Sequence, residues 1–533
     1  MGYLRDAAAR LLTSAAAVLS TPQPMSQPVT VKRAEPGMRA YGANPGLELG
    51  GRGRRLHAIP ATTTAINTLI MAYGTTVVAR SRYLCTNNPY AVAAKETFVS
   101  AMAGFGIKPS TLGETKDDKA QVQELWLDWC AEADADHLQD FYGQQAMVSA
   151  ELFEAGECFA VEVDAPGNST VPLSYRIYPA EMLPYQNDVM PTSQAAPGNY
   201  IYMGIEFTPT GERAAYHFYK RHPGEALPQS ALSDIGTIRI PAEKVLHMFR
   251  PIRAGQQRGI PFTLSALVTL AMLDLYDDAE LERKRVAALF AAFITKNPQE
   301  GSTPDSPLGQ PEQDPVTANM VVTMEPGATV ELNPGEDVSF ATPADVGNSY
   351  EAFQYRQLLR AAAGFGVPYA EMTGDLRQAN YGSIRAGLVA FRRRVTALQN
   401  HVLIFQFCRP IWVRWHDVAA AMKPKKLPWT FSQYMKDRAK HLRVRWIPPK
   451  WDWVDPAKDI AAEKIAVDNG FKARADTIEE QGYDPEETDA RIISDMEREE
   501  EFPRPLNTGQ QPPADPNADD APAPPANKEP TDA

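Results

Sequence analysis

One stretch without helix breakers limits the fold most strongly. After Pro261 the chain runs to Ile294 as "FTLSALVTLAMLDLYDDAELERKRVAALFAAFI", with no glycine and no further proline. Since proline is tolerated in a first helical turn, this pattern predicts one helix of about 30 residues, roughly 45 Å long. Its charges run from acidic to basic, the order that suits the helix dipole. Alone this is an ordinary surface helix, so the following segments decide the architecture.

A Pro-, Gly- and acid-rich excursion follows, ending in "NMVVTMEPGATVELNPGEDVSFATP". Three short runs in it have strand character: Met320–Thr323, Thr329–Leu332 and Val338–Phe340. Glu-Pro-Gly and Asn-Pro-Gly steps separate these runs, and proline followed by glycine is the chemistry of type II turns. The pattern predicts a small β-rich insert.

A second helix is predicted over Ser349–Phe365, because Gly364, Gly366 and Pro368 stop it there. The polar stretch "YAEMTGDLRQAN" follows, and then a third long helical pattern begins. A short loop held between two long helices usually positions functional residues, so this loop is a candidate functional site.

The third helix is capped by Asn380 or Ser383 and reaches about Met422, with a kink predicted at Pro410. Its apolar residues alternate steps of four and three, a heptad-like seam that can pack lengthwise on another helix. A core helix of a large α-rich domain has the same periodicity, so both interpretations stay open. The seam residues are Ile384, Leu388, Phe391, Val395, Leu398, Val402 and Phe405.

Ahead of these helices, helical and strand-like patterns alternate from Ala61 to about Pro251. The strand-like runs alternate apolar and polar residues and are rich in aromatic and β-branched ones, which predicts an α+β domain. These runs are "ECFAVEV", "LSYRIYP", "YIYMGIEF" and "AAYHFYK".

The last third is predicted to be mostly helical to about Phe502. Two roles are open to the tryptophans of this segment, Trp446, Trp451 and Trp453. Their rings can stack on nucleic-acid bases, but packing around the neighbouring prolines is the favoured interpretation. The Gly- and Arg-rich first 60 residues predict a flexible arm, and the aromatic-free segment from Pro503 predicts a disordered tail.

Charge, cysteine spacing and hydropathy argue against several classes of protein. With 53 basic and 66 acidic residues the net charge is −13, which argues against a protein that wraps nucleic acid tightly. The four cysteines are scattered without metal-ligand spacing, so no metal site, no cofactor and no disulfide framework is expected. No stretch is apolar enough for a membrane span, and the N-terminal apolar run lacks a cleavage site, so neither membrane contact nor secretion is predicted.

A search for catalytic motifs finds no phosphate loop, no His-Glu-x-x-His and no nucleophile elbow. The expectation is that the chain is not an enzyme.

The order of these pieces resembles the lambda-type portal proteins of tailed bacteriophages. The resemblance is carried by "HMFRPIRAGQQRGIPFTLSAL", by "EPGATVELNPGEDVSF" and by "LLRAAAGFGVPYAEMTGDLRQANYGSIRAGLVAFRRR". It covers the chain from Ala61 to Glu500, and the combination in this order is more specific than any single piece.

This resemblance implies an α+β, multi-domain, ring-forming portal fold with long stem helices, a β-rich clip insert, an α+β wing and a helical crown. The implied segments are an N-terminal arm (1–60), the wing (61–255), a first stem helix (256–296), the clip (297–343), a second stem helix (344–366), a tunnel loop (367–382), a long wing helix (383–422), the crown (423–502) and a disordered acidic, Pro-rich tail (503–533).

The resemblance also implies a function. Family members form a ring, typically a dodecamer, at one capsid vertex of the virion, and DNA enters and leaves through the ring. The implied partners are further copies of the chain, double-stranded DNA bound without sequence preference, the terminase large subunit, the major capsid and scaffold proteins, and head–tail adaptors. Assembly would take place in the host cytoplasm.

Site residues follow from the same resemblance. The tunnel loop would present Tyr369, Glu371, Asp375, Arg377, Gln378, Asn380 and Tyr381 to the channel. The clip would dock its partners through Glu325, Pro326, Gly327, Asn333, Pro334 and Gly335. Subunits would pack through Ile384, Leu388, Phe391, Val395, Leu398 and Val402. The N-terminal arginines Arg52, Arg54 and Arg55 are candidate contacts to scaffold, capsid or DNA.

Two alternatives stay open. The first is another ring or adaptor protein of a virion without a packaging role, which should lack an insert between the stem helices. The second is a nuclease or hydrolase whose site is assembled from distant residues.

Overall fold

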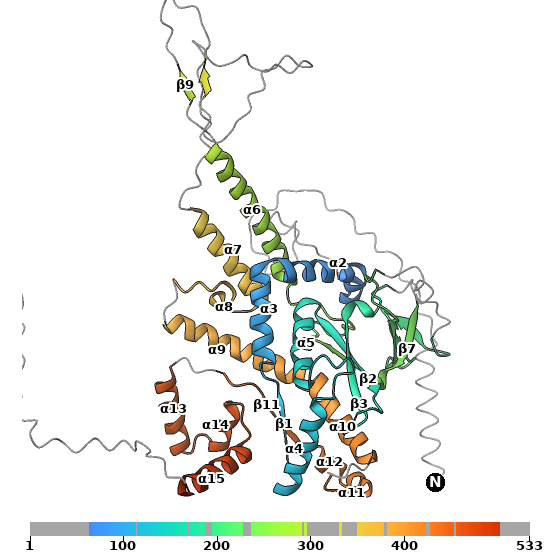
Figure 1. Ribbon diagram of the computed structural model, residues 1–533. Helices are drawn as coiled ribbons and strands as arrows, with labels where there is room; N and C mark the ends of the chain where they lie inside the picture. The colour runs from blue at the N-terminus through green and yellow to red at the C-terminus, as the bar shows by residue number, and fades with distance from the viewer. Residues whose placement is uncertain are drawn as a thin grey trace, which may run out of the picture. The chain divides into compact units, whose positions relative to one another are not determined.

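The computed structural model describes residues 63–112, 115–168, 170–186, 195–226, 236–289, 293–295, 330–332, 349–377, 381–422, 427–451 and 455–501. The expected N-terminal arm, the C-terminal tail and nearly all of the expected clip lie outside the described residues. The described residues from Thr64 on belong to one compact unit in which helices and strands are mixed (Figure 1), as the sequence predicts.

Two antiparallel sheets form most of the β structure, with strand orders β3-β2-β8 and β4-β5-β6-β7. Their strands are β2 (Glu157–Asp164), β3 (Leu173–Pro179), β4 (Tyr200–Tyr202), β5 (Ile205–Phe207), β6 (Arg213–Tyr219), β7 (Thr237–Pro241) and β8 (Val245–Phe249). The four predicted strand-like runs correspond to β2 to β6. A turn at Met203 and Gly204, both with positive φ, divides the third run into β4 and β5.

The two sheets meet in one apolar cluster. Phe159 of β2 and Phe218 of β6 pack edge to face with ring centroids 5.1 Å apart, and both side chains are fully buried. Alternating aromatic residues on the strands therefore form the contact between the sheets.

Four helices precede or flank these sheets: α2 (Ile66–Asn87), α3 (Pro89–Met102), α4 (Lys116–Cys130) and α5 (Phe141–Glu154). Asn88 caps α3 by accepting a hydrogen bond from the N–H of Ala91 at 3.0 Å, and Asp140 caps α5 by accepting one from Gly143 at 2.7 Å. These caps satisfy N–H groups that a helix leaves unpaired at its start.

α6 (Leu264–Leu289) and α7 (Ser349–Phe365) lie side by side as an antiparallel helical hairpin (Figure 1). α7 has its predicted bounds, but the prediction that the first helix reaches Ile294 was wrong. The segment Phe293–Thr295 forms β9 instead and pairs in parallel with β10 (Val330–Leu332). Its aromatic and β-branched residues favour a strand over the last turn of a helix.

After α7 come α8 (Tyr369–Thr373), α9 (Tyr381–Leu398), a π-helix (Gln399–Cys408) and α10 (Arg409–Met422). The long helix ends at Met422, as predicted, and its departure from α geometry falls directly before Pro410. Proline has no N–H to donate and crowds the preceding turn, which is where the helix widens. The π-helix residue Gln406 exchanges two hydrogen bonds with the backbone of Phe249 at 2.9 and 3.1 Å, so it covers the edge of β8.

The main core lies where α10 meets α4. Four tryptophans are buried there, Trp126 and Trp129 of α4 and Trp412 and Trp415 of α10, and the rings of Trp126 and Trp412 have centroids 4.9 Å apart.

The C-terminal third contains α11 (Phe431–Lys436), α12 (Arg438–His441), β11 (Val444–Ile447), α13 (Pro456–Asp468), α14 (Arg474–Glu480) and α15 (Pro485–Glu501). It is mostly helical, as predicted, apart from β11. This strand pairs antiparallel with β1 (Lys108–Thr111), so the predicted wing and crown share a two-stranded sheet. Trp446 and Trp451 pack against the main core, which agrees with a packing role, and Trp453 lies outside the described residues.

Candidate functional site

Two glycines with left-handed backbone conformation lie in the segment between α7 and α9, one on each side of α8. Gly366, with φ of 75°, follows α7, and Gly374, with φ of 69°, follows α8. Since left-handed backbone is strained for other residues, these glycines determine where each helix stops. The N–H groups of Gly366 and Val367 both donate to the carbonyl of Ala362, at 2.8 and 3.2 Å.

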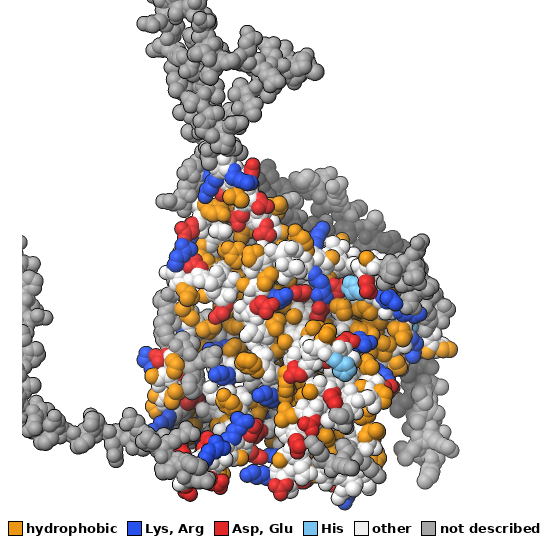
Figure 2. Space-filling view, in the orientation of Figure 1, with side chains coloured by type: hydrophobic (Ala, Val, Ile, Leu, Met, Phe, Trp, Pro, Cys, Tyr) orange, Lys and Arg blue, Asp and Glu red, His pale blue; other side chains and the backbone are white. Residues whose placement is uncertain are grey.

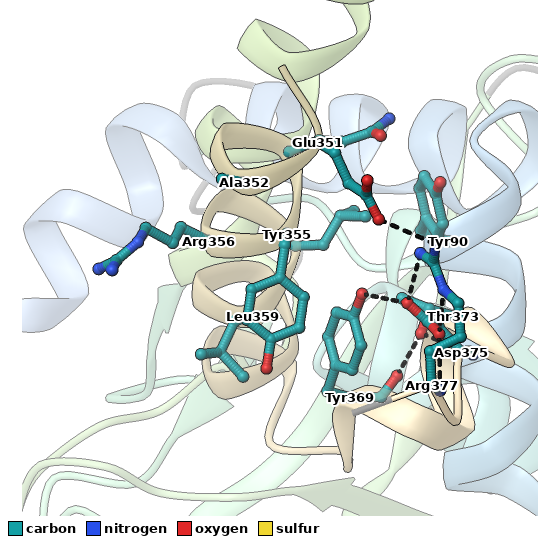
Figure 3. A pocket seen from close by; sticks show the side chains of 12 residues that line it. Tyr90, Glu351, Ala352, Tyr355, Arg356, Leu359, Tyr369, Thr373, Asp375 and Arg377 are labelled. Atoms are coloured by element: carbon teal, nitrogen blue, oxygen red, sulfur yellow. Dashed lines mark hydrogen bonds and ion pairs between the residues drawn. The ribbon is translucent and has the colours of Figure 1, made fainter. Parts of the chain in front are cut away.

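Arg377 ties this loop to α7 (Figure 3). Its Nη1 donates to Oε1 of Glu351 at 2.8 Å, while Nε and Nη2 donate to the two carboxylate oxygens of Asp375, each at 3.0 Å. Hydrogen bonds from the Arg377 side chain and backbone lower the pKa of Asp375 to about 2. The guanidinium of Arg377 is thus neutralised by two carboxylates of its own chain.

A cavity of about 820 Å³ opens beside this contact, lined by residues of α3, α7 and α8 and of the loop (Figure 3). Tyr355 and Tyr369 pack edge to face in it, with centroids 4.9 Å apart, and Tyr90 lies on the α3 side. Its walls mix tyrosines with charged side chains, a surface that suits weak polar contacts.

Of the predicted loop residues, Tyr369 and Glu371 lie on α8, and Asp375 and Arg377 lie in the segment after it. Tyr381 opens α9. Gln378 and Asn380 lie outside the described residues, as do the predicted docking residues of the clip, Glu325, Pro326, Gly327, Asn333, Pro334 and Gly335.

The predicted subunit-packing seam needs a correction. Four of its residues are buried in the core of their own chain: Phe391, Val395, Leu398 and Val402. Other side chains of the same chain cover these four residues, because the helix that carries them runs through the main core. For these residues the structure favours the alternative interpretation, a core helix. Ile384 and Leu388, nearer the start of α9, are only partly buried.

A different apolar stripe is exposed, and it lies on α6. Leu264, Val268, Met272 and Leu275 recur at steps of four, four and three, which places them on one helix face. Their exposed fractions are 46%, 72%, 61% and 64%. Figure 2 shows hydrophobic side chains at the surface over α6 and α7. The spacing was visible in the sequence, but periodicity does not say which face of a helix the chain's own core covers.

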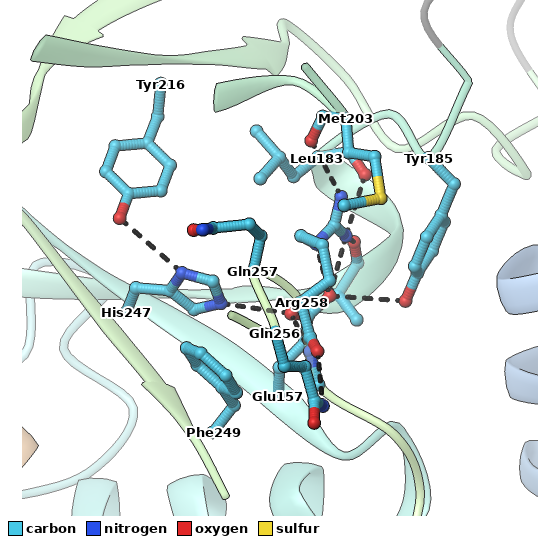
Figure 4. Close-up of polar contacts among 12 residues, drawn as sticks. Glu157, Leu183, Tyr185, Met203, Tyr216, His247, Phe249, Gln256, Gln257 and Arg258 are labelled. Carbon is cyan, nitrogen blue, oxygen red and sulfur yellow. Dashed lines mark hydrogen bonds and ion pairs between the residues drawn. The ribbon is translucent and has the colours of Figure 1, made fainter. Parts of the chain in front are cut away.

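A buried ionic network connects the sheet to the start of α6 (Figure 4). Glu157 of β2 accepts hydrogen bonds from Arg258 Nε at 2.7 Å, from His247 Nε2 at 3.0 Å and from the N–H of Gly259 at 2.6 Å. Arg258 also donates to the backbone carbonyls of Ala180, Leu183, Pro184 and Met203. Both ionic side chains are fully buried and well satisfied, which such charges require.

Contacts within the network and its burial shift the pKa values of Glu157 and His247. Burial alone would raise the pKa of Glu157, but the charge of Arg258 and the contact with His247 outweigh it and lower that pKa to about 2. Burial lowers the pKa of His247 to about 4, despite the neighbouring carboxylate. Near neutral pH the network therefore holds one anion, one cation and a neutral imidazole.

Metal-binding groups and cysteines were considered among the described residues. No group of three His, Cys, Asp or Glu side chains there could hold a metal ion. All four cysteines are buried, and burial raises the pKa of the Cys85 thiol to about 12. Within the described residues, no helix is both long and apolar enough to cross a membrane.

These elements define a mixed helix and sheet protein with a long helical hairpin and a glycine-bounded loop at its base. The chain belongs to the lambda family of phage portal proteins, because the family model described as phage portal protein, lambda family, matches residues 52–399.

Individual relatives agree with this membership. The chain is 24% identical over 303 residues to a probable portal protein of Halomonas phage phiHAP-1, covering 56% of each chain. It is also 24% identical over 274 residues to portal protein B of Escherichia phage lambda, covering 48% of this chain and 50% of that one. The matched region thus spans about half the length of these curated relatives.

Among solved structures, the chain is similar to one from the neck of a native gene transfer agent particle, computed with C12 symmetry. The sequence identity is 15% and the TM-score 0.39, over 78% of this chain and 94% of that one.

Proposed function

We propose that this chain assembles into a closed ring at one capsid vertex of a phage virion, and that DNA is packaged and ejected through the channel of this ring. Membership in the portal family supports the proposal. The observation in the structure that carries it is the exposed apolar stripe on α6.

This stripe favours contact with another copy of the chain. Val268 and Met272 are each more than half exposed on a helix whose other faces pack on α7 and α2. Contiguous exposed apolar surface of this kind usually marks an interaction site. In a ring, each copy contacts the next head to tail, so two different surfaces of the chain meet at every interface.

The loop at the base of the hairpin is the proposed channel constriction. Its Arg377 is neutralised by Asp375 and Glu351, so the described part of the loop presents no strongly phosphate-binding cation. A conduit for moving DNA benefits from this, because each neutralised phosphate strengthens binding by releasing counterions.

The partners are part of the proposal. The terminase large subunit and later the head–tail adaptors would dock on the segment 297–343 between the two stem helices. The major capsid and scaffold proteins would contact the ring during assembly in the host cytoplasm. The other segments would have the stem, wing and crown roles that the family resemblance implies.

A loop deletion tests the channel role. In a phage carrying this gene, deletion of Thr373–Ala379 should leave rings intact but reduce the fraction of DNA-filled heads seen by electron microscopy. A deletion of equal length within 503–533 is the control and should leave head filling unchanged. Loss of rings in the loop deletion would place these residues at a subunit interface and overturn the assignment.

A further inference from the structure

The C-terminal module, residues 456–501 with α13, α14 and α15, has no core of its own. None of its residues whose burial the structure describes is buried. Large apolar side chains are exposed on it instead, including Phe471 at 87%, Met496 at 60% and Ile493 at 53%. Folded domains normally bury such side chains together. The described part of the chain therefore leaves these side chains without a cover.

Polar contacts join the C-terminal module to the rest of the chain. Lys119 of α4 pairs with Glu486 of α15 at 2.7 Å, and Arg385 of α9 pairs with Asp459 of α13 at 2.9 Å. A cleft of about 530 Å³ lies between α4, β1 and the first half of α15. Ion pairs with exposed members contribute little to stability. They leave the apolar side chains of the module free to contact another partner.

One side of α15 combines apolar and acidic residues. Ile493 and Met496 are three positions apart, and each is followed four positions later by a glutamate, Glu497 or Glu500. This spacing places all four residues on one side of the helix, which we call the acidic face of α15, and all four are exposed. The whole helix has eight acidic residues and two arginines. The acidic face therefore matches a surface that is both apolar and basic.

The same chain carries such a surface in the segment 431–450. This segment has six lysines and arginines and one acidic residue. Phe431 and Met435 lie four positions apart on α11 and are 43% and 54% exposed, and Lys436 and Arg443 are exposed as well. In Figure 1, α4 lies between α11–α12 and α13–α15. Two complementary surfaces that lie apart on one subunit can meet between neighbours, as a head-to-tail interface requires.

We propose that the acidic face of α15 packs on the segment 431–450 of the neighbouring copy, an inference that rests on the proposed ring. Ile493 and Met496 contact the apolar side chains of α11 there, and the carboxylates of α15 meet its lysines and arginines. Apolar contact supplies the affinity, and the opposite charges select the partner surface. The C-terminal module then gains its missing core from the next subunit.

Charge argues against two other occupants of the acidic face. The tail 503–533 has five acidic and two basic residues, so it carries the same sign of charge as α15. DNA is also negative along its whole backbone. Like charges that face one another disfavour contact. A second copy of the chain offers the opposite charge together with exposed apolar side chains.

Charge reversal tests the proposal on the full-length protein, with rings counted by native mass spectrometry. Glu497→Lys combined with Glu500→Lys should raise the protein concentration needed for half assembly by about tenfold or more. Lys436→Glu combined with Arg443→Glu should act similarly, and all four changes together should restore assembly. The control, Glu212→Lys with Glu225→Lys at exposed positions elsewhere, should change that concentration by less than about twofold.

Crosslinking tests the same contact directly. The four natural cysteines are buried, so a short bis-maleimide reagent should react with introduced ones. A chain with both Met435→Cys and Met496→Cys should give a ladder of covalent oligomers on a denaturing gel. The control keeps Met435→Cys but replaces the second change by Leu138→Cys, at a position that is 86% exposed in another part of the chain, and should give no ladder.

Several results would decide against the contact. Normal rings in both charge-reversed variants without a ladder would overturn it and leave the ring itself standing. Failure of the fourfold variant to regain assembly, or crosslinks only within one chain, would overturn it too. If the wild-type chain forms no ring, the proposed function fails. A ladder would then still support the contact between copies, and its absence would refute this contact as well.

Discussion

Arg258 and Glu157 form a fully buried ion pair, with Nε of the arginine 2.7 Å from Oε1 of the carboxylate. The pair joins β2 to the segment that leads into α6. At the same place the backbones touch, since a Cβ on Gly259 would lie 2.2 Å from the carbonyl oxygen of Gly156. This contact determines where the helical hairpin leaves the sheet.

Glu157→Gln should destabilise the fold by roughly 3–5 kcal/mol, because it leaves the buried charge of Arg258 without a counterion. Thermal unfolding of the full chain measures the effect. The control is Arg474→Gln, which breaks a pair with Asp489 whose side chains are 56% and 49% exposed and should cost no more than about 1 kcal/mol. Equal losses in the two variants would contradict the role of the network.

His247 should make stability depend on pH. Its pKa is about 4 in the folded chain and about 6.5 unfolded, so between these values the unfolded chain binds a proton that the folded chain does not. Stability is therefore lost as the pH falls through this window, by at most about 3 kcal/mol for this residue.

His416 is also buried with a pKa lowered to about 4, mainly by burial, and it contributes to the same loss. His247→Gln should flatten the dependence of the urea midpoint on pH in this window only in part. A profile identical to the wild type would contradict a lowered pKa of His247 in the folded chain.

Val268→Glu should prevent ring formation while leaving the subunit folded, because it places a charge in the apolar stripe of α6. Leu281→Glu is the matched control. Leu281 is 58% exposed on the same helix, but six residues after Leu275 it lies on a different face. Native mass spectrometry distinguishes the outcomes, and rings in both variants would remove the stripe from the interface.

Gly366→Ala should destabilise the chain by at least about 1–2 kcal/mol, the cost of left-handed backbone for an L-residue, and should also displace Arg394. The control Gly387→Ala should have the opposite sign. Gly387 is exposed within α9 with open space around its Cα, so alanine there should stabilise the helix by about 0.5–1 kcal/mol. Similar effects at both glycines would contradict the left-handed turn at Gly366.

Long periodic segments were the most predictable from sequence. The bounds of α7 and β3 agree with the predicted runs, since glycines, prolines and strand-type residues mark their ends locally. β1 and β11 were not predicted, because each has only four residues and its pairing depends on a partner more than 300 positions away.

The candidate site was predicted less completely. The glycines that shape the loop were visible, but the pairing of Arg377 with Glu351 depends on how the loop folds back on α7. The seam on α9 and the π-helix has the periodicity of a packing helix. Four of its residues were predicted to contact a neighbouring subunit, but they pack in the core of their own chain. A repeat of apolar residues does not distinguish a chain's own core from a neighbouring subunit.

The most direct test of the central claim is the assembly state of the purified full-length protein, measured by native mass spectrometry together with electron microscopy. The account predicts a closed ring of about a dozen copies with an open axial channel, the cyclic symmetry of a head-to-tail interface. A stable monomer or dimer across salt and protein concentration would contradict it.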